Sequence, residues 1–144
     1  MIDEIDRKIL TSLQSDARIS YAELGRQIGL STPAVIERVR KLEYAGIVTG
    51  YRAEIDPSKV GLPIIAFIRM SISGVDYSHI IDVAKESLEV LECHRGTGGD
   101  SFIMKVAVSS VEHLQEVIDR LIPYGITTTT IVLSSPVKNR IVCV

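Results

Sequence analysis

The stretch ISYAELGRQIGLSTPAVIERVRKLEYAGIVTG, residues 19–50, indicates two short helices joined by a tight turn. Ser20 stands three residues before Glu23, which is the capping-box spacing at a helix start. Gly29 can take the left-handed conformation that ends a helix, and Leu30 can then pack back onto that helix. The first helix and its end are therefore predicted from local signals alone.

The second helix begins near Ser31, which can cap it, and it tolerates Pro33 because proline fits the first turn. Its apolar residues recur at i, i+4 and i+7, namely Val35, Val39 and Leu42. Gly46 ends the helix. Two amphipathic helices with a short glycine-containing turn match a helix-turn-helix, whose second helix enters the DNA major groove.

The outer face of the second helix carries short side chains first and cations later. That order suits a helix whose first turns meet base edges while its later cations meet phosphates. The predicted DNA contacts are Arg18, Tyr21, Ser31, Thr32, Pro33, Ala34, Glu37, Arg38, Arg40 and Lys41. The alternative for the three cations at 38, 40 and 41 is a solvated helix face paired with Glu37 and Glu43.

Residues 24–48, LGRQIGLSTPAVIERVRKLEYAGIV, resemble the DNA-binding motif of the Lrp/AsnC, or feast/famine, family of transcription regulators. The similarity extends upstream through IDEIDRKILTSLQSDARIS and downstream through GYRAEIDPSKVGLP, and continues more loosely through the second half. The resemblance implies double-stranded DNA and an amino-acid effector as partners. It also implies a homodimer that assembles further, often to an octamer.

Composition fits a soluble globular chain of one average domain or two small ones, with 144 residues, 46% hydrophobic and 24% charged. No run of about 18 apolar residues and no signal-peptide pattern occurs, so we expect a cytoplasmic protein. The net charge is −2, but residues 1–52 hold eight basic and seven acidic side chains. Cys93 and Cys143 lack metal spacing and are expected as free thiols, although a disulfide stays open.

We predict three segments: a helix-turn-helix domain over 1–52, a strand and linker over 53–63, and a second domain over 64–144. The first domain is a three-helix, winged-helix-like unit, and a strand is expected over 47–55. The second half alternates strands at 62–73, 90–97, 101–109 and 126–135 with helices at 77–88 and from a Ser109–Glu112 capping box to about 122. This β-α-β-β-α-β order is ferredoxin-like, so the predicted fold class is α+β.

Apolar residues occupy both faces of the predicted sheet. Helices can cover only one of those faces, and an antiparallel sheet that is apolar on both needs a second cover. The residues on the face without helices are predicted to be Ile65, Phe67, Ile103, Ala107, Ile131 and Leu133. We infer a partner subunit that packs sheet against sheet.

The loop HRGTGGDS, residues 94–101, joins the two middle strands and carries three glycines. Its amides and hydroxyls suit a carboxylate and Asp100 suits an ammonium, so together they suit an amino acid; the alternative is an ordinary hairpin turn. In the family the equivalent loop binds the effector; Gly98 matches its motif, whereas Ser101 stands where the family has an acidic residue. The predicted effector residues are His94, Gly96, Thr97, Gly98, Gly99, Asp100, Ser101, Thr128 and Thr130, with Thr127 and Thr129 as the alternative threonine pair.

No catalytic grouping is evident. The three histidines are scattered, and neither a phosphate-binding loop nor a metal spacing occurs, so we expect no enzyme activity, no cofactor and no metal. Two alternatives stay open. One is an architectural DNA-binding protein without an effector. The other is an enzyme similar to sirohaem decarboxylases, which would use His94 and Arg95.

Overall fold

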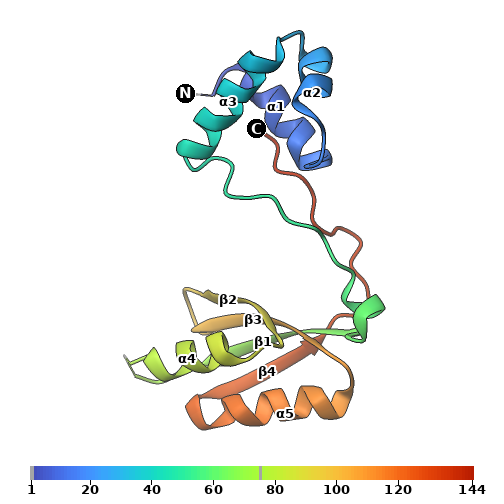
Figure 1. The fold of residues 1–144 in the computed structure, drawn as a ribbon. Coiled ribbons are helices and arrows are strands. Elements are labelled where there is room, and N and C mark those ends of the chain that lie inside the picture. The colour runs from blue at the N-terminus through green and yellow to red at the C-terminus, as the bar shows by residue number, and fades with distance from the viewer. Residues whose placement is uncertain (1, 75) are drawn as a thin grey trace. The chain divides into compact units, whose positions relative to one another are not determined.

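The computed structural model describes residues 2–74 and 76–144 and divides the chain into two compact units (Figure 1). One unit runs up to Glu54 and also takes in the C-terminal tail, Val137–Val144; the other spans Ile55–Pro136. The sequence placed the tail in the second domain. It groups with the first unit instead, where the Gln14 side chain pairs with the backbone of Val142.

The first unit contains α1 (Glu4–Ser15), α2 (Tyr21–Ile28) and α3 (Thr32–Tyr44). Asp3 and Asp6 form a reciprocal capping box at the start of α1, and Gly29 ends α2 with a φ of 77°, in the left-handed region. The Ser31 side chain makes no capping hydrogen bond, unlike the prediction. One apolar core joins the three helices through Ile9, Leu10, Leu13, Leu24, Val35, Val39 and Leu42.

The segment after α3 is not the strand predicted over residues 47–55. The amides of Ile47 and Val48 both donate to the carbonyl of Leu42, at 2.9 and 3.2 Å, so these two residues cap the C-terminal end of α3. The residues that follow are extended, but a strand requires a ladder with a neighbour. None of the described residues supplies that ladder, so the wing expected of a winged helix is not formed.

The second unit begins with the 3-10 helix η1 (Pro57–Val60). It continues through β1 (Ile64–Ser71), α4 (Ser78–Glu86), β2 (Val90–Arg95), β3 (Phe102–Val108), α5 (Val111–Leu121), the 3-10 helix η2 (Ile122–Tyr124) and β4 (Ile126–Ile131). The strands form one antiparallel sheet in the order β2-β3-β1-β4. This confirms the predicted ferredoxin-like domain and the α+β class.

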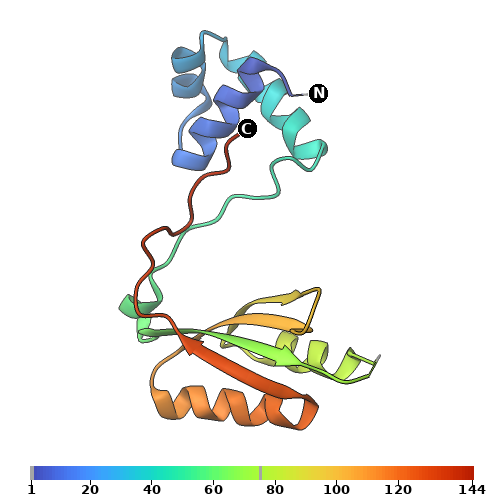
Figure 2. The same ribbon diagram turned by 180° about the vertical axis from the view of Figure 1, so that it is seen from behind.

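Both long helices of this unit pack on one face of its sheet (Figures 1 and 2). Their buried residues meet the inward residues of β1 and β3 in a single core: Ala66, Ile68, Met70, Ile80, Ala84, Phe102, Met104, Val106, Val108, Leu114, Val117 and Leu121. Phe67 and Ile103 lie on the opposite face and are partly exposed. Ile131 was predicted there too, but it pairs with Ala66 and so shares the helix-covered face. Leu133 lies beyond the end of β4.

Helix α5 begins one residue later than predicted. The His113 backbone N–H donates to the Ser110 hydroxyl at 3.1 Å, which makes Ser110 the cap instead of Ser109. The Ser109 hydroxyl lies 3.0 Å from Nδ1 of His113 and so has a different role. No helix in the described ranges has both the length and the apolar character needed to cross a membrane.

Candidate DNA-binding surface and effector loop

Helix α3 is held by one buried face, which leaves the opposite face open. Because Val35, Val39 and Leu42 are nearly inaccessible, the residues between them point outward. The predicted contacts that lie exposed on this helix and its cap are Ser31, Thr32, Pro33, Glu37, Arg40 and Lys41, and Ala34 is half-buried. Arg18 and Tyr21 are also exposed, in the turn before α2 and at its start.

Arg38 departs from this pattern because it faces α1. Its guanidinium donates to Asp3 at 2.7 Å and to Asp6 at 2.8 Å, and its side chain is only 30% exposed. The Asp6 backbone N–H and then the Arg38 guanidinium hold the pKa of Asp3 below its ordinary value, and both carboxylates raise the pKa of Arg38. Arg38 therefore ties the recognition helix to the start of α1; that it contacts DNA stays a prediction, and the set proposed below leaves it out.

Replacing Arg38 by alanine is expected to lower the melting temperature by a few degrees, because it leaves two clustered carboxylates without their cation. Replacing Arg40, which has no such contact, is expected to leave the melting temperature nearly unchanged. Circular dichroism melts of the two variants at low salt measure the difference. Equal melting temperatures would show that the Arg38 contacts do not contribute to stability.

The other two cations on α3 differ in their contacts. Lys41 is paired with Glu37 at 2.7 Å in an exposed i,i+4 contact, as the solvated-face alternative predicted. Arg40 has no ion pair among the described residues. Tyr44, four residues after Arg40 and 93% exposed, lies on the same face and lines one shallow depression with Pro33 and Arg40. The sequence interpretation missed Tyr44, although its i+4 spacing from Arg40 was a usable signal.

The hairpin loop between β2 and β3 is tied closely to the end of β1. The Ser101 N–H donates to the carbonyl of Met70 at 2.6 Å, and the Ile72 N–H donates to the Ser101 hydroxyl at 3.1 Å. The Ser71 hydroxyl donates to the carbonyl of Gly99. Gly98 has a φ of +90°, which favours glycine. Ser101 therefore shapes the loop through its hydroxyl.

Arg69 on β1 is a residue of this region that the sequence interpretation missed. Its guanidinium lies 3.4 Å from the Asp100 carboxylate, and in the sheet register Arg69 is opposite Thr128. Thr130 pairs with Phe67, so both predicted threonines lie on the face without helices. A single charged residue within the apolar strand IIAFIRMS was the signal that could have identified Arg69.

His94 lies on the same sheet face as Arg69, because both residues pair with Ile103, whereas the alternative threonines lie on the other face. Nε2 of His94 is 3.1 Å from Glu92, which also accepts a hydrogen bond from Lys105 at 3.3 Å. Thr127 and Thr129 are opposite Met70 and Ile68, on the helix-covered side of the sheet. The structure thus brings Asp100, Ser101 and Thr128 together through β1 and leaves His94 in a separate polar pair.

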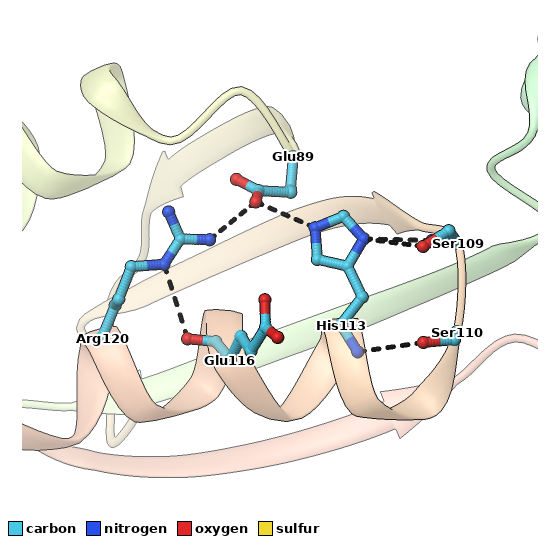
Figure 3. Close-up of polar contacts among 6 residues, drawn as sticks. All are labelled: Glu89, Ser109, Ser110, His113, Glu116 and Arg120. Carbon is cyan, nitrogen blue, oxygen red and sulfur yellow. Dashed lines mark hydrogen bonds and ion pairs between the residues drawn. The ribbon is translucent and has the colours of Figure 1, made fainter.

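A second polar cluster lies at α5 and was not predicted (Figure 3). Glu89 accepts hydrogen bonds from Nε2 of His113 at 3.0 Å and from Arg120 at 2.7 Å. Burial works against the charge of Glu89, but hydrogen bonds from His113, from its own backbone amide and from Arg120 outweigh burial and lower its pKa to about 2. The cluster joins the segment before β2 to both ends of α5.

A three-helix unit with an exposed second helix of a helix-turn-helix, joined to a ferredoxin-like unit, defines a DNA-binding regulator with a separate sensing domain. Comparison with known families agrees. Residues 2–43 match the AsnC-type helix-turn-helix domain, and residues 65–142 match the Lrp/AsnC ligand binding domain. The chain belongs to the Lrp/AsnC family of transcription regulators.

Individual relatives match along nearly the whole chain. The transcriptional regulator LrpC of Bacillus subtilis is 35% identical over 92% of both chains, and its structure superposes with a TM-score of 0.90 over 94% of this chain and 96% of that one. Regulatory protein AsnC of Escherichia coli is 36% identical over 98% of this chain and 96% of its own. A feast or famine regulatory protein from M. tuberculosis, solved with L-methionine, is 31% identical with a TM-score of 0.90 over 97% of each chain.

These relatives are transcription regulators and not enzymes, which sets aside the decarboxylase alternative for this chain. The geometry agrees with that conclusion. His94 contacts Glu92, whereas the Arg95 guanidinium lies 4.5 Å from the ring centre of Tyr77. Successive residues of a strand point to opposite faces, so the two side chains cannot act on one substrate atom.

Proposed function

We propose that the chain is a homodimeric cytoplasmic regulator that reads double-stranded DNA through the outer face of α3 and responds to an amino acid at the 94–101 loop. The observation that carries the DNA-reading part is the open outer face of α3, where Arg40 has no ion pair with any residue that the structure describes. Short groups at the start of the helix suit base edges, and the later cation suits a phosphate. The proposed set is Arg18, Tyr21, Ser31, Thr32, Pro33, Ala34, Glu37, Arg40, Lys41 and Tyr44.

Replacing Arg40 by alanine is expected to weaken DNA binding about tenfold for every sequence and to reduce the salt slope by about one, as for the loss of one phosphate contact. Fluorescence anisotropy at three salt concentrations, with specific and scrambled duplexes, measures both quantities. Lys85→Ala removes the same charge from an exposed position of α4 and serves as the control. Unchanged affinity would remove Arg40 from the set, and a loss confined to one base position would make it a base contact.

The effector proposal rests on the loop and on the amino-acid complex of a relative. The Gly98 and Gly99 amides have no hydrogen-bond partner within the described ranges, so they can donate to a carboxylate. Asp100 can accept from an ammonium, although it must then share its charge with Arg69. Thr128 lies opposite Arg69 and adds a hydroxyl to the same face.

Adding the effector is expected to raise the melting temperature of the wild-type protein or change its oligomer size, since ligand binding to the folded state stabilises it. A thermal-shift and light-scattering screen of the twenty amino acids identifies the ligand. Asp100→Asn is expected to lose at least tenfold in affinity for it, whereas Asp119→Asn, at an exposed position of α5, is expected to bind normally. Indifference to all twenty would favour the effector-free architectural protein.

The dimer proposal rests on the sheet face without helices. Phe67 and Ile103 are about one-third exposed there, and Ile65 is half-buried, which leaves an apolar strip unprotected. A second copy packed sheet against sheet would cover it and present two α3 helices to a two-fold symmetric operator. We propose further assembly to an octamer. Native mass spectrometry should give even-numbered species, and a monomer at micromolar concentration would contradict the dimer.

A further inference from the structure

The C-terminal tail, residues 137–144, is bound to the first unit by a specific backbone contact. The Val142 N–H donates to Oε1 of Gln14 at 2.8 Å, and Nε2 of Gln14 donates to the Val142 carbonyl at 3.0 Å. One carboxamide therefore satisfies both backbone groups of one tail residue, as a neighbouring strand would. A second contact joins the Asn139 side chain to Glu54. Figures 1 and 2 both show the C-terminus beside α1.

The tail forms one side of a groove that holds about 410 Å³ of open space, and the end of α1 and the segment that follows α3 form the other sides. Its walls are mainly apolar or uncharged: Leu10, Leu13, Gln14, Ala17, Ile47, Val48, Thr49, Gly50, Tyr51 and Arg52, with Val142 and Val144 contributed by the tail. The tail sequence IVCV has no charged side chain, which matches these walls. The groove and the tail are therefore complementary in polarity as well as in hydrogen bonding.

The far wall of the groove is connected directly to the recognition helix. The Tyr51 hydroxyl donates to Glu43 of α3 at 2.8 Å, and burial together with that carboxylate raises the pKa of Tyr51 to about 12. The Ile47 and Val48 amides are bonded to Leu42 of the same helix. Whatever occupies the groove thus contacts a segment whose position depends on α3.

The contact is small, since Val142 stays 68% exposed and Ile141 and Val144 each 40%. An isolated peptide of this size would bind weakly. Within one chain, however, a tethered segment has an effective concentration on the order of millimolar, so weak contacts suffice to keep the groove occupied. The chain's own tail is therefore the occupant that the geometry favours.

We propose that the groove on the DNA-binding unit is a receptor for residues 141–144 of the same chain, and that the docked tail fixes residues 47–52 behind α3. The second unit, which lies between Glu54 and Val137 in sequence, is then attached to the DNA-binding unit at both of its ends. The docking itself does not depend on the proposed effector or operator.

Hydrogen exchange of the full-length protein tests the docking. In the wild type, the Val142 amide is expected to exchange at least about tenfold more slowly than in the same peptide free in solution, because it donates to Gln14. Gln14→Ala is expected to raise its exchange to the free-peptide rate. Gln27→Ala removes the same side-chain amide from an exposed position of α2, and the Val142 amide of this variant is expected to exchange as in the wild type. Unchanged exchange over α2 and α3 confirms that Gln14→Ala stays folded.

Val142→Pro provides a second variant, since it deletes the donated N–H without altering α1, and faster exchange of the Ile47 and Val48 amides, which lie in the segment that the docked tail fixes, is expected. Free-peptide exchange in the wild type, or full protection in Gln14→Ala, would overturn the proposal. Docking within one chain is independent of dilution. Protection that disappears between micromolar and nanomolar protein would assign the tail to a second copy and would also overturn it. None of these readouts uses DNA or effector, so they stand apart from the proposed function.

Discussion

Gly25→Ala is expected to destabilise the DNA-binding unit by about 2–3 kcal/mol, although alanine is the better helix former by about 1 kcal/mol. Gly25 is buried in α2, and an added Cβ would lie 2.5 Å from the carbonyl oxygen of Leu30. That oxygen cannot move away easily, because the Leu30 N–H donates to the Gly25 carbonyl at 2.9 Å in the same turn. The Cβ would also lie 3.4 Å from Val35, so the clash separates the two helices of the motif.

Urea unfolding followed by circular dichroism measures this loss, and DNA binding is expected to fall with it. Gly99→Ala is the matched control, since no atom lies within 4 Å of its added Cβ and its φ is not in the left-handed region. Its free energy of unfolding is expected to change by less than about 0.5 kcal/mol. If both variants were equally stable, the turn between α2 and α3 would be more adaptable than its geometry implies.

The features that the sequence predicted are those set by neighbours in the chain. The cap at Ser20, the left-handed Gly29 and the buried stripe of α3 each depend on residues within one or two helical turns. The spacing of polar and apolar residues encodes them directly. The order of strands and helices in the second unit followed from the same local patterns, combined with a family resemblance.

The features that the sequence did not predict depend on residues distant in the chain. Arg38 looked like an outward cation until its carboxylate partners, 35 and 32 residues earlier, were located. Its position next to Val39 and Val35 gave no sign of those partners. The strand expected over 47–55 had the right alternation but no neighbouring ladder. Pairing is a property of the fold, and alternation alone does not supply it.

The candidate effector site was predicted in outline only. The glycine-rich loop lies between β2 and β3, as predicted, since three glycines among four residues are a strong local signal; its effector role stays a prediction. Whether Asp100 is free or paired depends on Arg69, which is 31 residues away on another strand. The threonine alternation left two pairs open, and only the β1–β4 register places Thr128 and Thr130 on the face without helices.

Glu89→Gln is expected to lower the free energy of unfolding by up to about 3 kcal/mol at pH 7. The Glu89 side chain is only 17% exposed, and its charge is met by His113 and Arg120 on α5 (Figure 3). Its pKa of about 2 in the folded protein lies below the ordinary 4.5, and each unit corresponds to about 1.4 kcal/mol. Glutamine keeps one acceptor oxygen but not the charge, so part of the hydrogen bonding persists.

The pH dependence of the stability that Glu89 contributes gives a second, more specific test. A carboxylate whose pKa is depressed on folding stabilises the protein above its unfolded pKa and loses that effect as pH falls through its folded pKa. The stability difference between wild type and Glu89→Gln should therefore be full above about pH 5 and shrink steadily toward pH 2. Urea denaturation of the second unit at pH 7, 5, 4 and 3 measures it. Glu116→Gln changes an exposed side chain on the same helix, so its free energy of unfolding should stay close to the wild-type value at every pH. If the stability lost in Glu89→Gln did not depend on pH, packing and not charge would hold α5 in place.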